Sequence, residues 1–521
     1  MNLPTANTAD PDVSAQPRSP HSSAPKLLII IGLVAACLLI LYHSLHTPTY
    51  TIDSYFYLSK AKQFAAGEGL RTSWNDGIDP KYFPGYSLAL ALSFSLGGGH
   101  VPVQLLVYVL SVILFIAICK EIGMDTIEQA LSSTAFLANP IVIKWHSLPM
   151  AEGTALAFSL AAVLAMLRSL KTRNYVFYFS AWILAGFALI TRAEAAFLLV
   201  VFCMLLFRRR HEIPSSAAMG GGLLFFLPLI LYWAKFNFMM GSAPAYVNEF
   251  RYTLAGANIV KNFVYNIYAP FGLMHKFSLG EVNTVLAPAV ATAGVIWLLV
   301  GGILFLGGLV AAVAGRTGSV ARASAILFLL FAAIHSLWYY RYERFMMLAL
   351  PFAALVWASS VTVYARRWKQ DRWLPLAAQT LMLSTGLVLA HHFSSVHSIS
   401  LQKDAARLNF VEIAQAVGAL NKPEEKPVLT DLGPHLAYYL DAQTYLDDDH
   451  GNYWQRAFAP ERTIESLKKL GIKLIVTRLD FDRWTAEHHV PPEMKLHFQE
   501  IRGEVEGATI IRYLPADVTG S

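Results

Sequence analysis

Long apolar segments recur along most of this 521-residue chain. Only 15% of the residues are charged and 55% are hydrophobic, which is more apolar surface than a soluble protein of this size can bury. The sequence therefore predicts an all-α polytopic membrane bundle. About eleven segments are long enough, or nearly so, to cross a bilayer, at residues 27–45, 102–119, 129–143, 154–170, 175–190, 194–207, 217–235, 285–313, 323–339, 345–365 and 374–393.

The basic residues indicate how these segments are oriented. The formal net charge is +6, and the Lys and Arg residues fall in short clusters between apolar segments. With a cytoplasmic N-terminus, the positive-inside rule is satisfied, because one side then carries Lys120 and the basic residues of 168–173, 208–210, 316–322 and 366–372. We interpret the basicity as membrane topology and expect no nucleic-acid binding.

The chain divides into three parts by composition. Residues 1–25 are rich in Ser, Pro, Ala and Thr, which predicts a disordered cytoplasmic tail, and residues 26–393 form the transmembrane domain. From about residue 394 the composition becomes charged and mixed, so we expect residues 394–521 to be a small soluble α/β domain outside the membrane. Its strand-like runs are 427–432, 473–477 and 508–513, and its helical run is 459–470.

Two outer loops, 46–85 and 236–284, are unusually long and aromatic, and long loops on a rigid scaffold often carry function. The segment 86–97 is too short to span and ends in glycines, so we expect an interfacial or re-entrant helix on the outer face. The stretch 175–207 is divided at residues 191–192, since one helix of roughly 33 residues is ~50 Å long against a hydrocarbon core of ~30 Å.

Asp53 is the main catalytic candidate. It follows the first span by a few residues and is flanked by aromatic side chains, including Tyr55 and Tyr57, which places a partly desolvated carboxylate at headgroup depth. Such a carboxylate can accept a proton from an incoming hydroxyl or amine. The alternative is that Asp53 caps the helix indicated by residues 54–64. Both interpretations stay open, and we count the two tyrosines as candidate substrate-binding residues.

Further candidates lie at the ends of other apolar segments. Lys81 and Tyr82 lie between two prolines, where they suit either a lipid phosphate or a simple interfacial anchor. Glu152, Arg192 and Glu194 are charges at helix ends, where ionised groups need partners or water. Either Arg192 and Glu194 only pair with each other, or all three share a polar cavity with the first loop.

Arg341, Tyr342 and Arg344 lie in a short outer connection. A guanidinium group binds phosphate oxygens in a bidentate fork, so these residues are a candidate phosphate or pyrophosphate clamp. The competing interpretation is an aromatic belt with interfacial arginines, although the positive-inside rule disfavours two arginines in an outer loop.

We expect no metal site and no cysteine chemistry. The cysteines all lie inside apolar runs, and the pairs His391-His392 and His488-His489 have no partners at the spacing of zinc ligands. The sequence also contains no P-loop and no dinucleotide fingerprint.

Several motifs, in order along roughly residues 27–393, resemble the bacterial membrane glycosyltransferases of the GT-C type. The branch is the one related to protein O-mannosyltransferases and to the aminoarabinose transferase of lipid A. The motifs are DSYFYL at 53–58, AAGEGL at 65–70, PGYSL at 84–88, TRAE at 191–194 and RY at 341–342. Two positions depart from the usual pattern: Ser54 replaces a second acid of the first loop, which weakens the case for divalent-metal assistance, and Ala193 replaces a proline.

The resemblance implies an inverting transfer of a sugar from a polyprenyl-phosphate donor at the outer face of the bacterial cytoplasmic (inner) membrane. The acceptor would be a lipid such as lipid A, a polysaccharide or a protein. Asp53 matches the family's base, Lys81 its contact with the lipid phosphate, and Arg341 a later cationic partner. Glu152 and Arg192 match motif positions to which the resemblance assigns no specific role. No cofactor is implied, and the use of a divalent metal stays open.

Three other functions compete with this hypothesis. A transporter or lipid flippase also holds charges among apolar helices, but near the bilayer midplane and with paired halves or broken helices. A polymerase or ligase of surface polysaccharide differs in moving a preformed chain. A non-catalytic receptor would use residues 394–521 for binding and leave the first loop unexplained.

Overall fold

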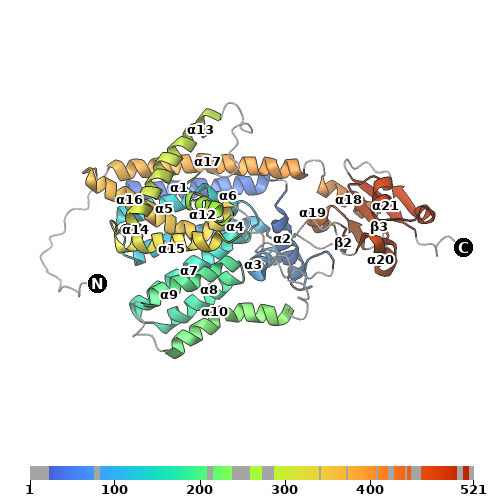
Figure 1. The fold of residues 1–521 in the computed structure, drawn as a ribbon, viewed down its shortest axis with the longest axis horizontal. Coiled ribbons are helices and arrows are strands. Elements are labelled where there is room, and N and C mark those ends of the chain that lie inside the picture. Colours follow the sequence, from blue (N-terminus) through green and yellow to red (C-terminus); the bar gives the residue numbers. More distant parts are fainter. Residues whose placement is uncertain are drawn as a thin grey trace.

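The computed structural model describes most of the chain, and the fold below refers to that part. Figure 1 shows a bundle of helices at one end and an α/β unit at the other, with α2 and α19 between them. The described residues are 23–47, 49–75, 82–207, 215–236, 258–272, 287–338, 342–370, 373–405, 409–420, 427–440, 443–447, 459–501 and 508–514.

Six described helices are long and apolar enough to cross a bilayer, judged by length and composition. They are α1 (Ala24–His46), α4 (His100–Glu121), α7 (Ala151–Thr172), the continuous stretch Ala287–Val313, the stretch Glu343–Arg367, and α17 (Trp373–Ala405). The stretch Ala287–Val313 consists of α13 (Ala287–Ile296), a π-helical segment η5 (Trp297–Ile303) and α14 (Leu304–Val313). The stretch Glu343–Arg367 consists of the 3₁₀ helix η6 (Glu343–Ala349) and α16 (Leu350–Arg367). The chain is therefore a multi-pass membrane protein.

Further helices, most of them shorter, complete the bundle. They are α2 (Ile52–Ala65), α3 (Pro84–Ser95), α5 (Thr126–Leu137), α6 (Pro140–His146), α8 (Tyr175–Leu189), η2 (Ala193–Phe197), α9 (Leu198–Phe207), α10 (Ser215–Phe236), α12 (Asn258–Tyr268) and α15 (Ser319–His335). The expected total of about eleven spans stays a prediction, because several of these helices fall below the length of a spanning helix.

The expected span at 129–143 is wrong as a single helix. Helix α5 ends at Leu137 and α6 begins at Pro140. Asn139 caps α6 by accepting a hydrogen bond from the backbone N–H of Ile141 at 3.0 Å, and proline at the first position has no N–H to continue the preceding helix. Since residues 130–150 are all buried, this broken segment is an internal part of the bundle.

Two other sequence predictions about helix ends are confirmed. Helix α8 ends at Leu189 and η2 begins at Ala193, with Arg192 in an extended conformation between them, so 175–207 is divided as expected. The segment 86–97 is the short helix α3, which ends before Gly97 at a φ of 76°. Its depth relative to the membrane stays a prediction.

The C-terminal unit contains a five-stranded sheet of order β2-β1-β3-β5-β4. The strands β1 (Val428–Thr430), β2 (Thr444–Leu446) and β3 (Leu474–Thr477) are parallel, and β5 (Thr509–Tyr513) and β4 (Phe498–Ile501) are antiparallel. Its helices are α18 (Phe410–Leu420), α19 (Gly433–Tyr439), η8 (Pro460–Arg462), α20 (Thr463–Leu470), α21 (Phe481–Glu487) and η9 (Pro492–His497). Alternate residues of β3 join separate apolar clusters, so both faces of the sheet are covered. The three predicted strands and the predicted helix are confirmed, whereas β2 and β4 were missed.

The first of the two long loops, 46–85, is joined to this sheet. The backbone N–H of Asn75 donates to the carbonyl of Thr444 at 2.7 Å, and the N–H of Leu446 donates to the Asn75 side chain at 2.9 Å. The loop therefore extends the edge of the sheet beside β2. Because α2 also packs on α19, the loop that carries Asp53 contacts both the bundle and the C-terminal unit.

Candidate functional site

Asp53 lies in the first turn of α2, and two side chains from distant segments bind its two oxygens. The hydroxyl of Tyr82 donates to Oδ1 at 2.7 Å, and the Nη2 group of Arg344 donates to Oδ2 at 2.8 Å. The capping alternative is wrong, because Thr51 is the N-cap and its side chain accepts from the N–H of Ser54. The Asp53 side chain is therefore directed away from its own helix and into an ionic contact.

Arg344 enters the site from η6. Its guanidinium carbon lies 5.5 Å from the centre of the Trp145 ring, 5.1 Å from that of Phe345 and 5.5 Å from that of Tyr342. The Nε atom is 3.6 Å from Oε1 of Glu152. Aromatic faces attract a guanidinium group and limit its rotation, so this cation is held in place while it contacts two acids.

Glu152 lies in the first turn of α7, where the helix dipole favours a carboxylate. Its side chain is 2% exposed, and Oε1 accepts from Nη1 of Arg192 at 2.6 Å. The other oxygen, Oε2, is buried and has no hydrogen-bond partner among the described residues. A buried carboxylate oxygen without a donor is costly, so this position suits a hydrogen-bond donor from a ligand or from water.

Arg192 continues the cluster to a third acid. Its Nη2 group donates to Oε1 of Glu194 at 2.5 Å, and its guanidinium carbon lies 5.6 Å from the centre of the Phe345 ring. The two interpretations of Arg192 from the sequence are both partly right. Arg192 pairs with Glu194, and it also binds Glu152. We call Asp53, Arg344, Glu152, Arg192 and Glu194 the charge cluster; in it, carboxylates and guanidinium groups alternate.

Aromatic side chains border the charge cluster on the side of α2 and α3. The ring of Tyr82 stacks on Phe56 with 4.5 Å between ring centres and meets Tyr57 edge-on at 5.4 Å. Tyr55 lies elsewhere: its hydroxyl contacts Thr49 at 3.0 Å and its ring is 4.8 Å from that of His435 on α19. The structure thus groups Tyr57 and Tyr82 with Asp53 and separates Tyr55 from them.

Two predicted site residues, Lys81 and Arg341, lie outside the described residues. Their neighbours Tyr82 and Tyr342 are described, and both border the charge cluster. The roles assigned to all of these residues stay predictions.

The sequence analysis missed two buried lysines. Lys60, which is 2% exposed, donates to the carbonyl of Tyr82 at 2.7 Å and so fixes the segment next to Asp53. Its position seven residues after Asp53, two helical turns along α2, is a usable signal. Lys144 pairs with Glu343, the residue next to Arg344. Lys144 could have been found from the sequence because it lies in a strongly apolar segment, where an ionised group needs a partner.

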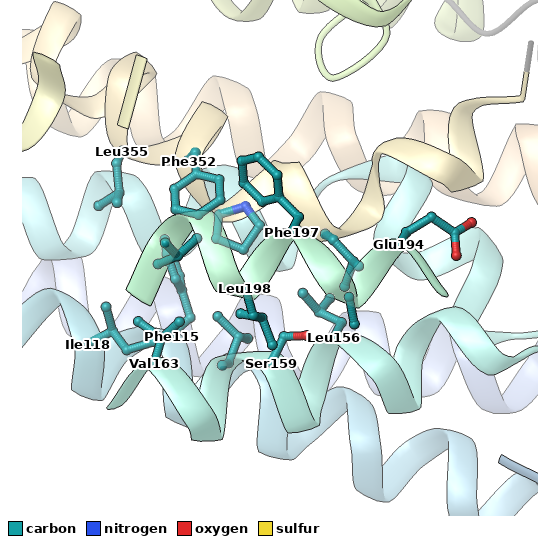
Figure 2. Close-up of a pocket in the computed structure, with 15 residues that line it drawn as sticks. Phe115, Ile118, Leu156, Ser159, Val163, Glu194, Phe197, Leu198, Phe352 and Leu355 are labelled. Atoms are coloured by element: carbon teal, nitrogen blue, oxygen red, sulfur yellow. The ribbon is translucent and has the colours of Figure 1, made fainter. Parts of the chain in front are cut away.

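An apolar cavity begins at the end of the charge cluster. Its volume is about 520 Å³, including the part open to solvent. Figure 2 shows Glu194 at one end of the row of lining side chains, with Ile118 and Leu355 at the other. The walls come from α4, α7, η2, α9, η6 and α16, through Phe115, Ile118, Leu156, Ser159, Leu160, Val163, Glu194, Ala195, Phe197, Leu198, Val201, Leu348, Pro351, Phe352 and Leu355.

Comparison with solved structures identifies the fold. The apo structure of ArnT from Cupriavidus metallidurans is similar over 93% of this chain and 97% of that chain, with a TM-score of 0.58 and 14% sequence identity. The structure of the same enzyme bound to undecaprenyl phosphate is similar over 94% and 98%, with a TM-score of 0.56 and 12% identity. The fold is that of a GT-C type glycosyltransferase.

The shared fold agrees with the resemblance carried by the sequence motifs. The similarity covers almost the whole of both chains, so it includes the C-terminal unit as well as the helical bundle. Neither a protein-family model nor a curated protein sequence matches the chain.

Proposed function

We propose that this protein is an inverting glycosyltransferase that moves a sugar from a polyprenyl-phosphate donor to a lipid, polysaccharide or protein acceptor. The observation that carries the proposal is the arrangement of the site. A carboxylate suited to act as a base, Asp53, belongs to a charge cluster whose last member, Glu194, lines an apolar cavity. A polar head and an apolar tail on one substrate need these two environments side by side.

The donor's phosphate is assigned to the guanidinium groups of the charge cluster. Arg344 and Arg192 are 14% and 13% exposed and are already held by aromatic rings, so little conformational entropy is lost when they bind an anion. The apolar cavity is assigned to the isoprenoid tail. Support comes from ArnT, which has a similar fold and has been solved with undecaprenyl phosphate.

The proposed reaction follows from these assignments. The acceptor's hydroxyl or amine attacks the anomeric carbon from the side opposite the phosphate, and the bond between that carbon and the phosphate oxygen breaks. Asp53 takes the acceptor's proton, and Arg344 stabilises the charge that builds up on the departing polyprenyl phosphate. The family resemblance adds Lys81 and Arg341 as further phosphate contacts.

The contact between Asp53 and Arg344 also suggests an order of binding. While Oδ2 of Asp53 accepts from Arg344, one face of the base is occupied. A donor phosphate competes for the same guanidinium group, so donor binding weakens the hold of Arg344 on Asp53. The base then becomes fully available when the donor is in place, which limits unproductive encounters with the acceptor.

The outer face of the cytoplasmic membrane is the proposed location of the site. Helix α7 begins at the charge cluster with Glu152, and its last turns carry Arg168 and Lys171. Both of these cations pair with Glu121, the last residue of α4. A helix of this length is about 33 Å long. Since the basic end belongs in the cytoplasm by the positive-inside rule, the charge cluster is assigned to the opposite face.

The alternative of a transporter or flippase fits the site less well. Transported polar substrates bind near the bilayer midplane at broken helices. Here Asp53 and Glu152 lie in the first turns of α2 and α7, so these two charges are at helix ends.

The experiment compares cells that contain the wild-type chain, no chain, or the Asp53→Asn variant. Mass spectrometry of lipid A, surface polysaccharide and glycoproteins is expected to show one sugar modification that only the wild-type chain produces. The matched control is Asp125→Asn, which changes a half-exposed carboxylate that caps α5 and that asparagine can replace as a cap. Unchanged glycans together with altered uptake of a solute would instead support the transporter.

A further inference from the structure

A second buried ion pair, Lys144 with Glu343, lies next to the charge cluster, because Glu343 directly precedes Arg344 in the chain. Nζ of Lys144, on α6, is 2.7 Å from Oε1 of Glu343, the first residue of η6, and the two side chains are 9% and 7% exposed. The hydroxyl of Tyr265 donates to Oε2 of Glu343 at 3.3 Å. Tyr265 belongs to α12, within the second long outer loop, so three separate segments meet at one carboxylate.

Among the described residues, neither Lys144 nor Glu343 forms an ion pair with a member of the charge cluster, so the pair needs an energetic explanation of its own. Transferring two charges into an apolar bundle costs desolvation free energy that their attraction only partly offsets. Buried ion pairs are therefore weak stabilisers, and their best supported use is to fix the register of one element against another.

The Lys144–Glu343 pair fixes the register of η6 against α6, and this register determines where the side chain of Arg344 lies. Lys144 contacts Glu343, and the next residue on α6, Trp145, contacts the next residue on η6, Arg344. A shift of η6 by one residue would direct Glu343 toward Asp53 and Glu152, and three carboxylates would then face one another. The two consecutive contacts select the register that puts a cation between those acids.

We infer that Lys144 and Glu343 are positioning residues, whose ion pair fixes η6 so that the guanidinium group of Arg344 is directed at Asp53 and at the donor phosphate. The inference rests on the proposed function, because it concerns how the proposed phosphate site is built. The hydrogen bond from Tyr265 makes the second outer loop part of the same support.

The test measures the affinity of the purified full chain, in lipid nanodiscs, for undecaprenyl phosphate. Lys144→Met is expected to weaken binding about tenfold, in line with the coupling between residues that share a network. In an Arg344→Gln background the same change is expected to have an effect of less than about twofold. The matched control is Lys171→Met, which removes a lysine that pairs with Glu121 at 3.1 Å and is expected to leave the affinity unchanged.

A second variant separates positioning from folding. Lys144→Met combined with Glu343→Leu replaces both charges with apolar side chains, which is compatible with a stable bundle. We expect this variant to unfold at a temperature close to that of the wild type and still to bind undecaprenyl phosphate about tenfold more weakly.

Three results would overturn the inference. If the double variant binds like the wild type, the pair does not fix the register. If Lys144→Met weakens binding equally with and without Arg344, the pair does not act through that residue. If the wild-type chain itself does not bind undecaprenyl phosphate, the proposed function fails, and the positioning role fails with it.

Discussion

The contact between Asp53 and Arg344 makes an unusual prediction: removing the proposed base is expected to tighten donor binding. The two groups are 2.8 Å apart and each side chain is 14% exposed, so the contact is largely shielded from water. In the wild type, a donor phosphate has to displace the carboxylate before it gains the full interaction with the guanidinium group. Asp53→Asn removes the charge of this competitor while keeping its size.

The magnitude follows from the energetics of hydrogen bonds. A hydrogen bond to a charged group contributes about 1.5 to 3 kcal/mol, and the neutral bond that asparagine retains contributes about 1 kcal/mol. The nearby Glu152, 3.6 Å from Arg344, recaptures part of the freed guanidinium. The difference is about 0.5 to 2 kcal/mol before this recapture. A net gain of about 0.5 to 1 kcal/mol remains, which corresponds to an affinity for undecaprenyl phosphate about two- to fivefold higher.

The assay is equilibrium binding of undecaprenyl phosphate to the full chain in lipid nanodiscs, with Asp125→Asn as the matched carboxylate control. Sugar transfer by Asp53→Asn is expected to be lost in the same preparation. To separate competition from simple repulsion between Asp53 and the phosphate, the measurement is repeated in an Arg344→Gln background. Competition predicts that Asp53→Asn no longer tightens binding in the Arg344→Gln background. The reasoning would be refuted if Asp53→Asn tightened binding equally in both backgrounds, or if it did not tighten binding in the wild-type background.

Further predictions concern the cavity, the C-terminal unit and metals. Val163→Phe, which fills part of the apolar cavity, is expected to weaken binding of undecaprenyl phosphate at least about tenfold and that of a short-chain prenyl phosphate less than about twofold; equal losses would contradict the assignment of the tail. Burial lowers the pKa of His488, but its hydrogen bond to Asp447 at 2.9 Å and the negative charge there outweigh this, so the pKa is raised. The protonated pair therefore stabilises the C-terminal unit below pH ~6.5 and loses this effect as the pH rises through the raised pKa. Hydrogen exchange near α21, corrected for its intrinsic pH dependence, is expected to be slower at the lower pH in the wild type, with the difference lost in His488→Gln. Because guanidinium groups already neutralise Asp53 and Glu152, EDTA is expected to leave undecaprenyl phosphate binding unchanged, and a loss restored by a divalent cation would contradict this.

The sequence by itself determined the class of fold and the positions of many elements. Apolar segments of spanning length predicted the membrane bundle, and the extended Arg192 between α8 and η2 follows from the limit that bilayer thickness places on helix length. The short strands β1, β3 and β5 were visible as apolar runs bounded by polar residues. The residues Asn139 and Pro140 also indicate the break between α5 and α6, since they are a helix cap followed by a proline, but the continuous apolar pattern led to the prediction of a single helix.

The sequence also indicated which charges were exceptional, because ionised groups at the ends of apolar helices are costly without partners. It named Asp53, Glu152, Arg192, Glu194 and Arg344 as candidates, and the structure brings these five together. It did not indicate which partner each would take.

Only the tertiary structure decided those pairings. Asp53 and Arg344 are 291 residues apart in the chain, and Lys144 and Glu343 are 199 apart. Such contacts depend on how each helix is rotated about its axis and on the register between packed helices, and local sequence patterns do not specify either quantity. The same reason explains Tyr55: its neighbours in the chain suggested the site, but the rotation of α2 directs its ring toward α19.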